Sequence, residues 1–139
     1  MLATIPGSIP GAVDEVLRYS PSIVAWRRRA VRDTEIGGTP IPQGADILLL
    51  MASANRDETH FADGESFDLG RANAREHLSF GFGIHYCLGN ALAKLQARIA
   101  IEEVARLAPS IRLADGHDIR FADNLSFRGP TAVPVTWAG

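Results

Sequence analysis

The chain has a single cysteine, Cys87, so its side chain can act as a thiol, a thiolate or a metal ligand but cannot form an internal disulfide. Cys87 follows a glycine-containing loop and precedes a long alanine- and leucine-rich stretch that is expected to be a helix. Free N–H groups and the positive end of the helix dipole favour a thiolate there and can hydrogen-bond its sulfur. The sequence therefore predicts a cysteine that can hold a metal.

Three glycines flank this cysteine. Gly81 and Gly83 permit backbone angles that other residues avoid, and they let the chain approach a flat ligand closely. Gly89 leaves room beside the sulfur because it has no side chain. A large planar cofactor would suit such a loop.

Other roles for the cysteine are less well supported by the residues around it. A zinc site built from His77, His85 and Cys87 would lack a fourth ligand and the usual paired cysteines. A nucleophilic pair of Cys87 and His85 would lack a third group to orient the histidine. A lone cysteine is most often a small buried apolar side chain, and only the surrounding motif argues against that reading. His60 and His117 are interpreted as surface residues.

Three motifs resemble those of the cytochrome P450 family. Residues 80–89 match the haem-binding signature FxxGxxxCxG at every specified position, and Glu15 and Arg18 match the ExxR motif upstream. A Glu and Arg pair at this spacing would by itself be an ordinary helix contact. It is interpreted as a motif only because the other two motifs occur with it. The meander arginine motif is resembled by Phe67, Asp68 and Arg71.

The resemblance implies a bacterial-type haem-thiolate protein of which residues 1–139 form a partial domain. The chain resembles the C-terminal third of such a protein, and it lacks the distal helix that activates oxygen. Cys87 would be the axial ligand of haem b iron, and Phe80 would pack beside its sulfur. Arg28, His77 and His85 would contact the haem propionates.

The same resemblance assigns two further groups of residues. Glu15, Arg18 and Arg71 would form a salt-bridge triad that supports the loop rather than touching substrate. The substrate pocket would include Val24, Ala25 and Phe127.

The activity implied by the resemblance is monooxygenation. Haem iron would activate O2 and insert one oxygen atom into a small hydrophobic organic substrate. Electrons would come indirectly from NAD(P)H through a ferredoxin-type donor and its reductase. The alternatives are a catalytically inactive haem-binding remnant and one part of a split enzyme that needs a missing N-terminal portion.

Two basic residues on the long helix suggest where a redox partner would bind. Lys94 and Arg98 are one turn apart and continue the basic character of Arg71 and Arg75. An acidic redox protein would fit this face. An ordinary solvated face explains the same pattern.

The remaining pattern predicts an α+β chain that is mainly helical, like the haem-proximal part of the family's fold. Helices are expected at residues 12–19 and 88–107, the second apolar on nearly all sides and therefore expecting burial on several sides. Residues 57–84 lack periodicity and form a long ordered loop, which is usually functional. Strands are expected at residues 23–31, 34–36 and 45–51, the last buried on both faces, with a helical turn at 52–56 and small strands after Pro109.

Alternation within the first strand places Arg28 on the opposite side from its two arginine neighbours. An inward arginine needs an anion, which a haem propionate would supply. An ion pair with a carboxylate is the structural alternative.

Composition limits the classes of partner. The 139 residues are 46% hydrophobic and 22% charged, as in one ordinary globular unit, and the net charge of -2 provides no basic field for nucleic acid. The longest apolar run, residues 47–52, is far shorter than the roughly 20 residues that cross a bilayer. A cytoplasmic protein without membrane or nucleic-acid partners is therefore expected.

Overall fold

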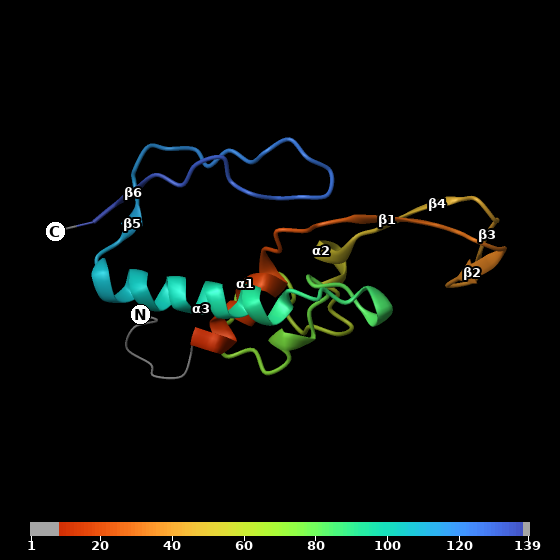
Figure 1. Cartoon of the computed structure of the whole chain (residues 1–139), viewed down its shortest axis with the longest axis horizontal. Helices are drawn as coiled ribbons and strands as arrows, with labels where there is room; N and C mark the ends of the chain where they lie inside the picture. The colour runs from red at the N-terminus through yellow and green to blue at the C-terminus, as the bar shows by residue number, and fades with distance from the viewer. Residues whose placement is uncertain (1–8, 138–139) are drawn as a thin grey trace.

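The computed structural model describes residues 9–137, so residues 1–8 and 138–139 of the predicted partial domain lie outside the described residues. Two helices dominate the structure, and short ribbons and loops surround them (Figure 1). The elements are α1 (Ile9–Tyr19), β1 (Trp26–Arg29), β2 (Thr34–Ile36), β3 (Thr39–Ile41), β4 (Asp46–Leu49), α2 (Met51–Ala54), η2 (Ala74–Glu76), η3 (Gly83–His85), α3 (Asn90–Leu107), β5 (Arg112–Leu113) and β6 (Val135–Thr136).

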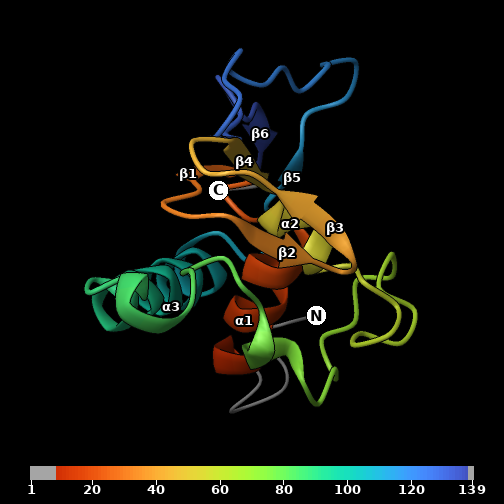
Figure 2. The same cartoon turned by 90° about the vertical axis from the view of Figure 1, so that its right-hand side faces the viewer.

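Helix α1 is the best-buried element and packs against α3 and η2 (Figure 2). Its buried face carries Ala12 and Val13 together with the charged Glu15 and Arg18. The amide of Ser20 donates the last helical bond to the carbonyl of Val16, and the helix ends before Pro21, as predicted. Helix α1 therefore presents charged as well as apolar groups to the interior.

Within residues 9–137 the strands pair only two by two, all antiparallel: β1 with β4, β2 with β3, and β5 with β6. Gly37 and Gly38, both with positive φ, make the turn between β2 and β3. The prediction that residues 45–51 are buried on both faces is wrong. Leu48 and Leu49 are 42% and 38% exposed, because β4 pairs only with β1 and no second described layer covers the ribbon.

The irregular region predicted between residues 57 and 84 is a compact loop. It contains one short 3-10 turn, η2, and a second 3-10 turn, η3, begins near its end at Gly83. Gly64 is required where the loop touches the chain after α2, since a Cβ at that position would collide with the backbone carbonyl of Arg56. The loop's interior is partly polar: Phe61 and Ala74 are buried, and so are Asn55, His77 and Ser79. Hydrogen bonds therefore hold this region as much as apolar packing does.

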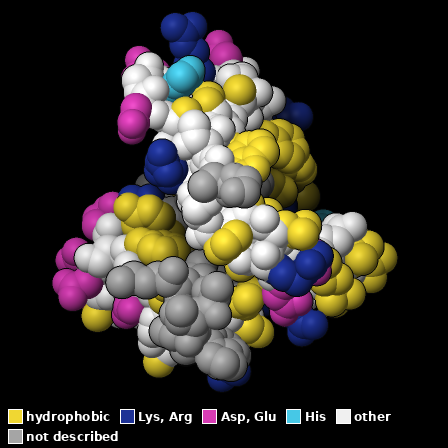
Figure 3. Space-filling model, turned by 90° about the vertical axis from the view of Figure 1, so that its left-hand side faces the viewer, with side chains coloured by type: hydrophobic (Ala, Val, Ile, Leu, Met, Phe, Trp, Pro, Cys, Tyr) yellow, Lys and Arg dark blue, Asp and Glu magenta, His cyan; other side chains and the backbone are white. Residues whose placement is uncertain are grey.

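Helix α3 begins at Asn90, two residues later than predicted. Residues 87–89 form a turn instead, in which the Asn90 amide and side chain both donate to the carbonyl of Cys87, at 3.2 and 2.8 Å. No described residue of α3 is buried, and Leu92 is 60% exposed. Hydrophobic side chains gather in patches on the surface (Figure 3). The described residues therefore do not provide the burial on several sides that the apolar pattern of α3 predicted.

Candidate cofactor site

A cavity of about 780 Å³ lies between α3 and the segment that leads into β1. Its volume is in the range of small-molecule and cofactor sites. The walls come from α1, residues 22–28, α2, the loop before α3, and α3 itself. The lining residues are Leu17, Ser22, Ile23, Trp26, Arg28, Met51, Ser79, Phe80, Gly81, His85, Cys87, Ala93 and Ala97.

Cys87 lines this cavity as a free, exposed thiol. Its amide donates to the carbonyl of Phe80 at 2.8 Å, and the Tyr86 amide donates to the carbonyl of Gly83 at 3.0 Å. Gly81 has φ 76°, and a Cβ there would lie 3.3 Å from the carbonyl oxygen of His85. The loop therefore closes on itself and presents its cysteine to the cavity.

Small residues on α3 form one wall beside the cysteine. Ala93 and Ala97 are one turn apart and both line the cavity. Gly89 is one turn before Ala93, and a Cβ added to it would lie 3.9 Å from the Cys87 sulfur. These short side chains leave space for a flat group against the helix. The spacing of Ala93 and Ala97, one and two turns after Gly89, is the sequence signal that could have predicted this wall.

Arg28 and His85 supply the positive and polar groups of the cavity. Arg28 is half-buried, whereas its neighbours in β1 are exposed, as alternation predicted. Its Nη1 donates to the carbonyl of Arg27 at 2.8 Å, and within residues 9–137 no carboxylate forms an ion pair with it. The arginine therefore retains N–H donors for an anion in the cavity.

Behind the cavity, Glu15, Arg18 and Arg71 meet in one cluster. Arg18 Nε lies 2.7 Å from Glu15 Oε2, and Arg71 Nε lies 3.3 Å from Glu15 Oε1. Burial alone would raise the pKa of Glu15, but hydrogen bonds from Arg18 and the Asp68 amide outweigh it and hold that pKa below its usual value. The cluster joins α1 to the loop, away from the cavity wall.

Asn55 continues this cluster toward the cysteine loop. Its carbonyl accepts from Arg18 at 2.8 Å, its Nδ2 donates to Ser79 Oγ at 2.8 Å, and its Oδ1 accepts from the Leu78 amide at 2.7 Å. The Ser79 hydroxyl in turn donates to the carbonyl of Leu17 at 2.6 Å. Asn55 could not be predicted as a site residue from the sequence, because nothing in its spacing marks a buried amide.

The arrangement fits haem by the chemistry of its donors. A single thiol stands at an apolar cavity large enough for a planar group, small residues lie beside the sulfur, and a basic residue is free of carboxylates. Among residues 9–137, no group of three or more His, Cys, Asp or Glu could hold a metal ion, and no hydrogen bond joins the Cys87 sulfur to a histidine. The described residues therefore suit one axial thiolate rather than zinc.

The family model of cytochrome P450 matches residues 9–106. The chain belongs to the cytochrome P450 family. Cytochrome P450 CREJ, a solved structure, is 66% identical with a TM-score of 0.95 over 99% of this chain and 34% of that one. The heme domain of Acinetobacter radioresistens CYP116B5 is 41% identical with a TM-score of 0.96 over 99% of this chain and 33% of that one. The resemblance and the fold class, part of a P450 fold, are thus confirmed.

A curated relative, the 20-oxo-5-O-mycaminosyltylactone 23-monooxygenase of Streptomyces fradiae, is 40% identical over 98% of this chain and 32% of its own length. The steroid C26-monooxygenase of Mycolicibacterium smegmatis is 39% identical over 93% of this chain and 32% of its own length. The chain therefore spans about a third of the length of the P450s it matches. Among the described residues, no helix is both long and apolar enough to cross a membrane.

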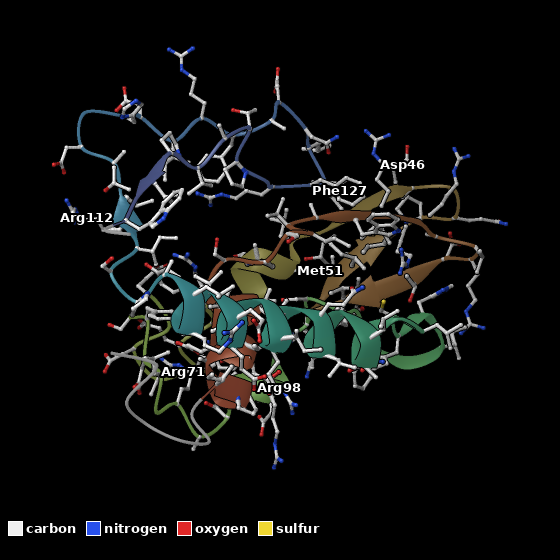
Figure 4. All side chains as sticks on the ribbon, turned by 60° about the vertical axis from the view of Figure 1, so that its left-hand side comes forward. Asp46, Met51, Arg71, Arg98, Arg112 and Phe127 are labelled. Atoms are coloured by element: carbon white, nitrogen blue, oxygen red, sulfur yellow. The ribbon has the colours of Figure 1, made fainter. Side chains whose placement is uncertain are left out.

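Some residues expected at a P450 cofactor or substrate site do not line the cavity. Ala25 is buried at 3% exposure, and neither Val24, Gly83 nor Gly89 is a lining residue. Phe127 stands behind the wall, with its ring 5.9 Å from that of Trp26 in an edge-on contact. Figure 4 shows Phe127 and Met51 on one side of α3 and Arg98 on the other. Four apolar lining residues were not predicted from the sequence: Leu17, Ile23, Trp26 and Met51.

His77 is likewise not brought to this cavity. Its side chain is 2% exposed, and its Nε2 lies 3.8 Å from Asp14 Oδ1 on α1. Burial, and then the positive charge of Lys94, lower the pKa of His77, although Asp14 acts in the opposite direction. The ring is therefore interior, its neutral form is favoured, and it does not line the cavity that Cys87 lines.

The two basic residues expected to form a face on α3 both have carboxylate partners. Lys94 is only partly exposed, and its Nζ lies 2.7 Å from Asp14 Oδ1. Arg98 Nε lies 3.2 Å from Glu102 Oε1, and Arg71 is engaged with Glu15. Each of these two basic residues is thus paired with a carboxylate, Lys94 with one on α1 and Arg98 with one on α3.

Proposed function

We propose that this chain forms the haem-binding part of a P450 monooxygenase, with Cys87 as the axial ligand of the iron. The observation that carries the proposal is the position of Cys87, the chain's single cysteine, on the wall of an apolar cavity of about 780 Å³. A thiolate there would benefit from the N–H groups of the turn that follows it and from the start of α3. Deprotonated Cys87 would bind the iron, and its electron donation is what supports O–O cleavage by haem proteins of this type.

The residues around the cysteine would orient the cofactor. Arg28 and His85 would bind the propionates, since both line the cavity and Arg28 has no carboxylate partner among the described residues. Phe80 and Gly81 would lie beside the sulfur and keep water from it. Gly89 would leave space at the sulfur, and Gly83 would shape the turn through its positive φ. His77 is not part of this set, because its buried ring does not line the cavity.

A haem titration tests this assignment. The purified chain should bind haem with a single site, and Cys87→Ser should change the spectrum of the bound form by removing the soft thiolate ligand. Arg28→Gln should weaken binding by about tenfold or more if it holds a propionate, as for loss of a charge-assisted hydrogen bond. Arg27→Gln, an exposed neighbour in β1, is the matched control and should bind like the wild type. Equal effects at both arginines would count against the propionate role.

For the whole protein we propose O2-dependent insertion of one oxygen atom into a small hydrophobic substrate, with electrons from NAD(P)H delivered through a ferredoxin-type donor and its reductase. Two relatives support the reaction class, being named as monooxygenases of a steroid and of a mycaminosyltylactone. Ile23, Trp26 and Met51 would line the pocket, with Val24, Ala25 and Phe127 behind them.

One relative suggests a narrower substrate class. CREJ, 66% identical, was also solved in complex with (4-ethylphenyl) dihydrogen phosphate. We propose that alkylphenyl phosphates bind the haem-loaded protein. Adding this compound should perturb the haem absorption spectrum, and 4-ethylphenol is the matched control without phosphate. A response to the phenol alone would contradict the need for the phosphate.

The alternative is a chain that binds haem without turnover, or one part of a split enzyme. The extensive exposed apolar surface of α3 favours this alternative for the isolated polypeptide. Coexpression with the portion that the relatives possess outside the matched region separates the two cases. Restored substrate oxidation supports the split enzyme, and assembly without oxidation supports the inactive haem-binding chain.

A further inference from the structure

His77 occupies a buried junction between three parts of the fold. Its ring lies between Asp14 of α1 and Phe80 of the cysteine loop, with Nε2 3.8 Å from Asp14 Oδ1 and its ring 5.7 Å from that of Phe80. Lys94 of α3 closes the junction, since its Nζ is 2.7 Å from Asp14 Oδ1 and 5.8 Å from the Phe80 ring centre. Neither the cofactor assignment nor the Glu15 cluster uses this histidine.

The hydrogen bonds define which nitrogen of His77 carries its proton. The Ser79 amide donates to His77 Nδ1 at 3.1 Å, so Nδ1 must be unprotonated. The neutral ring then carries its hydrogen on Nε2, the nitrogen that faces Asp14. His77 Nε2 and Asp14 Oδ1 are the two buried side-chain atoms without a hydrogen-bond partner among the described residues, although Asp14 Oδ1 is ion-paired with Lys94.

Ser79, whose amide donates to His77, belongs to the segment that anchors the cysteine loop. Ser79 is bonded through its hydroxyl to Asn55 and Leu17, and through its amide to His77. Phe80 follows directly, and its carbonyl accepts the Cys87 amide at 2.8 Å. The path from His77 to Cys87 is therefore one backbone step and two hydrogen bonds long.

We propose that His77 is a positioning residue for the haem-ligand loop, and that its neutral ring fixes residues 79–80 and, through them, Cys87. This inference rests on the proposed function, because it concerns the loop that would hold the iron. A proton added to Nδ1 would turn the acceptor into a donor facing the Ser79 amide, so the loop would lose this bond. The lowered pKa of His77, caused by burial and then by Lys94, supports a ring that stays neutral near neutral pH.

Other ionisable groups surround the histidine. Asp14 faces it from α1 and Lys94 from α3. On its other side it shares a cavity of about 570 Å³ with further polar groups of the loop region. These are Asp57, His60, Arg75, Glu76 and Tyr86.

The first test needs neither a variant nor haem. Nitrogen-15 spectra of the chain with labelled histidine report the tautomer of each ring and its titration. His77 should show Nδ1 as the unprotonated nitrogen at pH 7 and should take up its proton below the ordinary histidine value of 6.5. A ring protonated at Nδ1, or charged at pH 7, overturns the proposal.

The second test uses two variants that distinguish the role of Nδ1 from that of Nε2. In His77→Asn the amide oxygen sits near the place of Nδ1 and can still accept from Ser79, whereas in His77→Gln the amide lies farther out, near Nε2. Exchange of the Ser79 amide should stay close to wild type in the first variant. In the second it should be about fivefold faster, as for loss of one hydrogen bond.

The same pair is then compared in the haem-loaded chain, reduced under carbon monoxide. His77→Asn should retain the strongly red-shifted band of thiolate ligation, and His77→Gln should lose part of it. If both variants behave like wild type, or both lose protection equally, the Nδ1 acceptor does not position the loop. If the wild-type chain shows no shifted band, haem ligation fails as a function, while Ser79 exchange still decides the role of His77.

Discussion

Arg18 and Glu15 form a fully buried ion pair in which Arg18 Nε lies 2.7 Å from Glu15 Oε2. The pair is more than a helix contact at i,i+3 spacing. Nη1 of the same guanidinium donates to the carbonyl oxygens of Asn55 and Gly64, and Nη2 donates to that of Ser66, each at 2.8 Å. One side chain of α1 thus satisfies three carbonyls of the loop region, whose interior holds few large apolar residues.

Glu15→Gln should be strongly destabilising, because it leaves the buried charge of Arg18 without its counterion. Loss of one partner from a buried pair typically costs about 3–5 kcal/mol in free energy of unfolding. The midpoint of urea unfolding measures this cost.

The matched control is Glu103→Gln, which breaks the exposed pair with Arg106 on α3. Such surface pairs contribute about 0–1 kcal/mol, so the midpoint should hardly move. Similar losses in the two variants would show that burial does not set the strength of the Glu15 pair.

Asn55→Ala should weaken the hydrogen bonds that anchor the cysteine loop and so lower the stability of the chain. The change removes the acceptor of the Leu78 amide and the donor to Ser79, and the resulting buried unpaired group costs about 1–3 kcal/mol. Urea unfolding would show the loss. Asn73→Ala, whose side chain makes one exposed bond to the carbonyl of His60, should cost less than half as much by the same reasoning. A larger effect at Asn73 would be inconsistent with this view of the loop.

Stability should fall in two stages as the pH is lowered. The pKa of His77 is lowered in the folded chain, so its contribution is complete above the ordinary value of 6.5 and is lost as the pH falls through the folded value. The pKa of Glu15 is also lowered, so its contribution is complete above 4.5 and is lost at more acidic pH. Urea midpoints measured across this range should show both stages.

His77→Asn separates the two stages, because asparagine does not titrate. The first decline, below pH 6.5, should become smaller in this variant, and the acid decline should remain. An unchanged first decline would mean that another group causes it.

Much of the fold followed from periodicity and turn chemistry. The helix at the C-terminal side of Cys87 and the strand at residues 34–36 were predicted, because the pattern of apolar residues is a local signal. Strand burial was predicted less well. An apolar run such as residues 47–52 indicates only that a strand there would be stabilised by burial. Whether the strand is buried depends on another layer that covers it.

The candidate site divides in the same way. Cys87 could be named from the haem-binding signature and Arg28 from strand alternation, whereas the partners of Asn55 and Lys94 could not be named from sequence. Asn55 is hydrogen-bonded to Ser79, which is 24 residues away in the sequence, and Lys94 of α3 is ion-paired with Asp14 of α1. Contacts of this kind have no periodic signal, so a lysine that looked like a solvated or docking residue proved to be part of a helix pair.

Gly81→Ala should disturb the loop that presents Cys87. Alanine is strained at φ 76°, and its Cβ would press on the carbonyl of His85 at 3.3 Å, so a cost of about 1–2 kcal/mol and weaker haem binding are expected. Gly129→Ala is the control, since a Cβ there meets nothing within 4 Å. Thermal unfolding and haem titration of both variants test the difference, and equal behaviour would refute the role given to Gly81.

The most direct measurement is the absorption spectrum of the purified chain with haem, reduced under carbon monoxide, beside Cys87→Ala. Thiolate ligation predicts a strongly red-shifted Soret band in the wild type and its disappearance in the variant. A chain that folds and binds haem without this band, or a band that survives in Cys87→Ala, would contradict the assignment of Cys87 as the iron ligand.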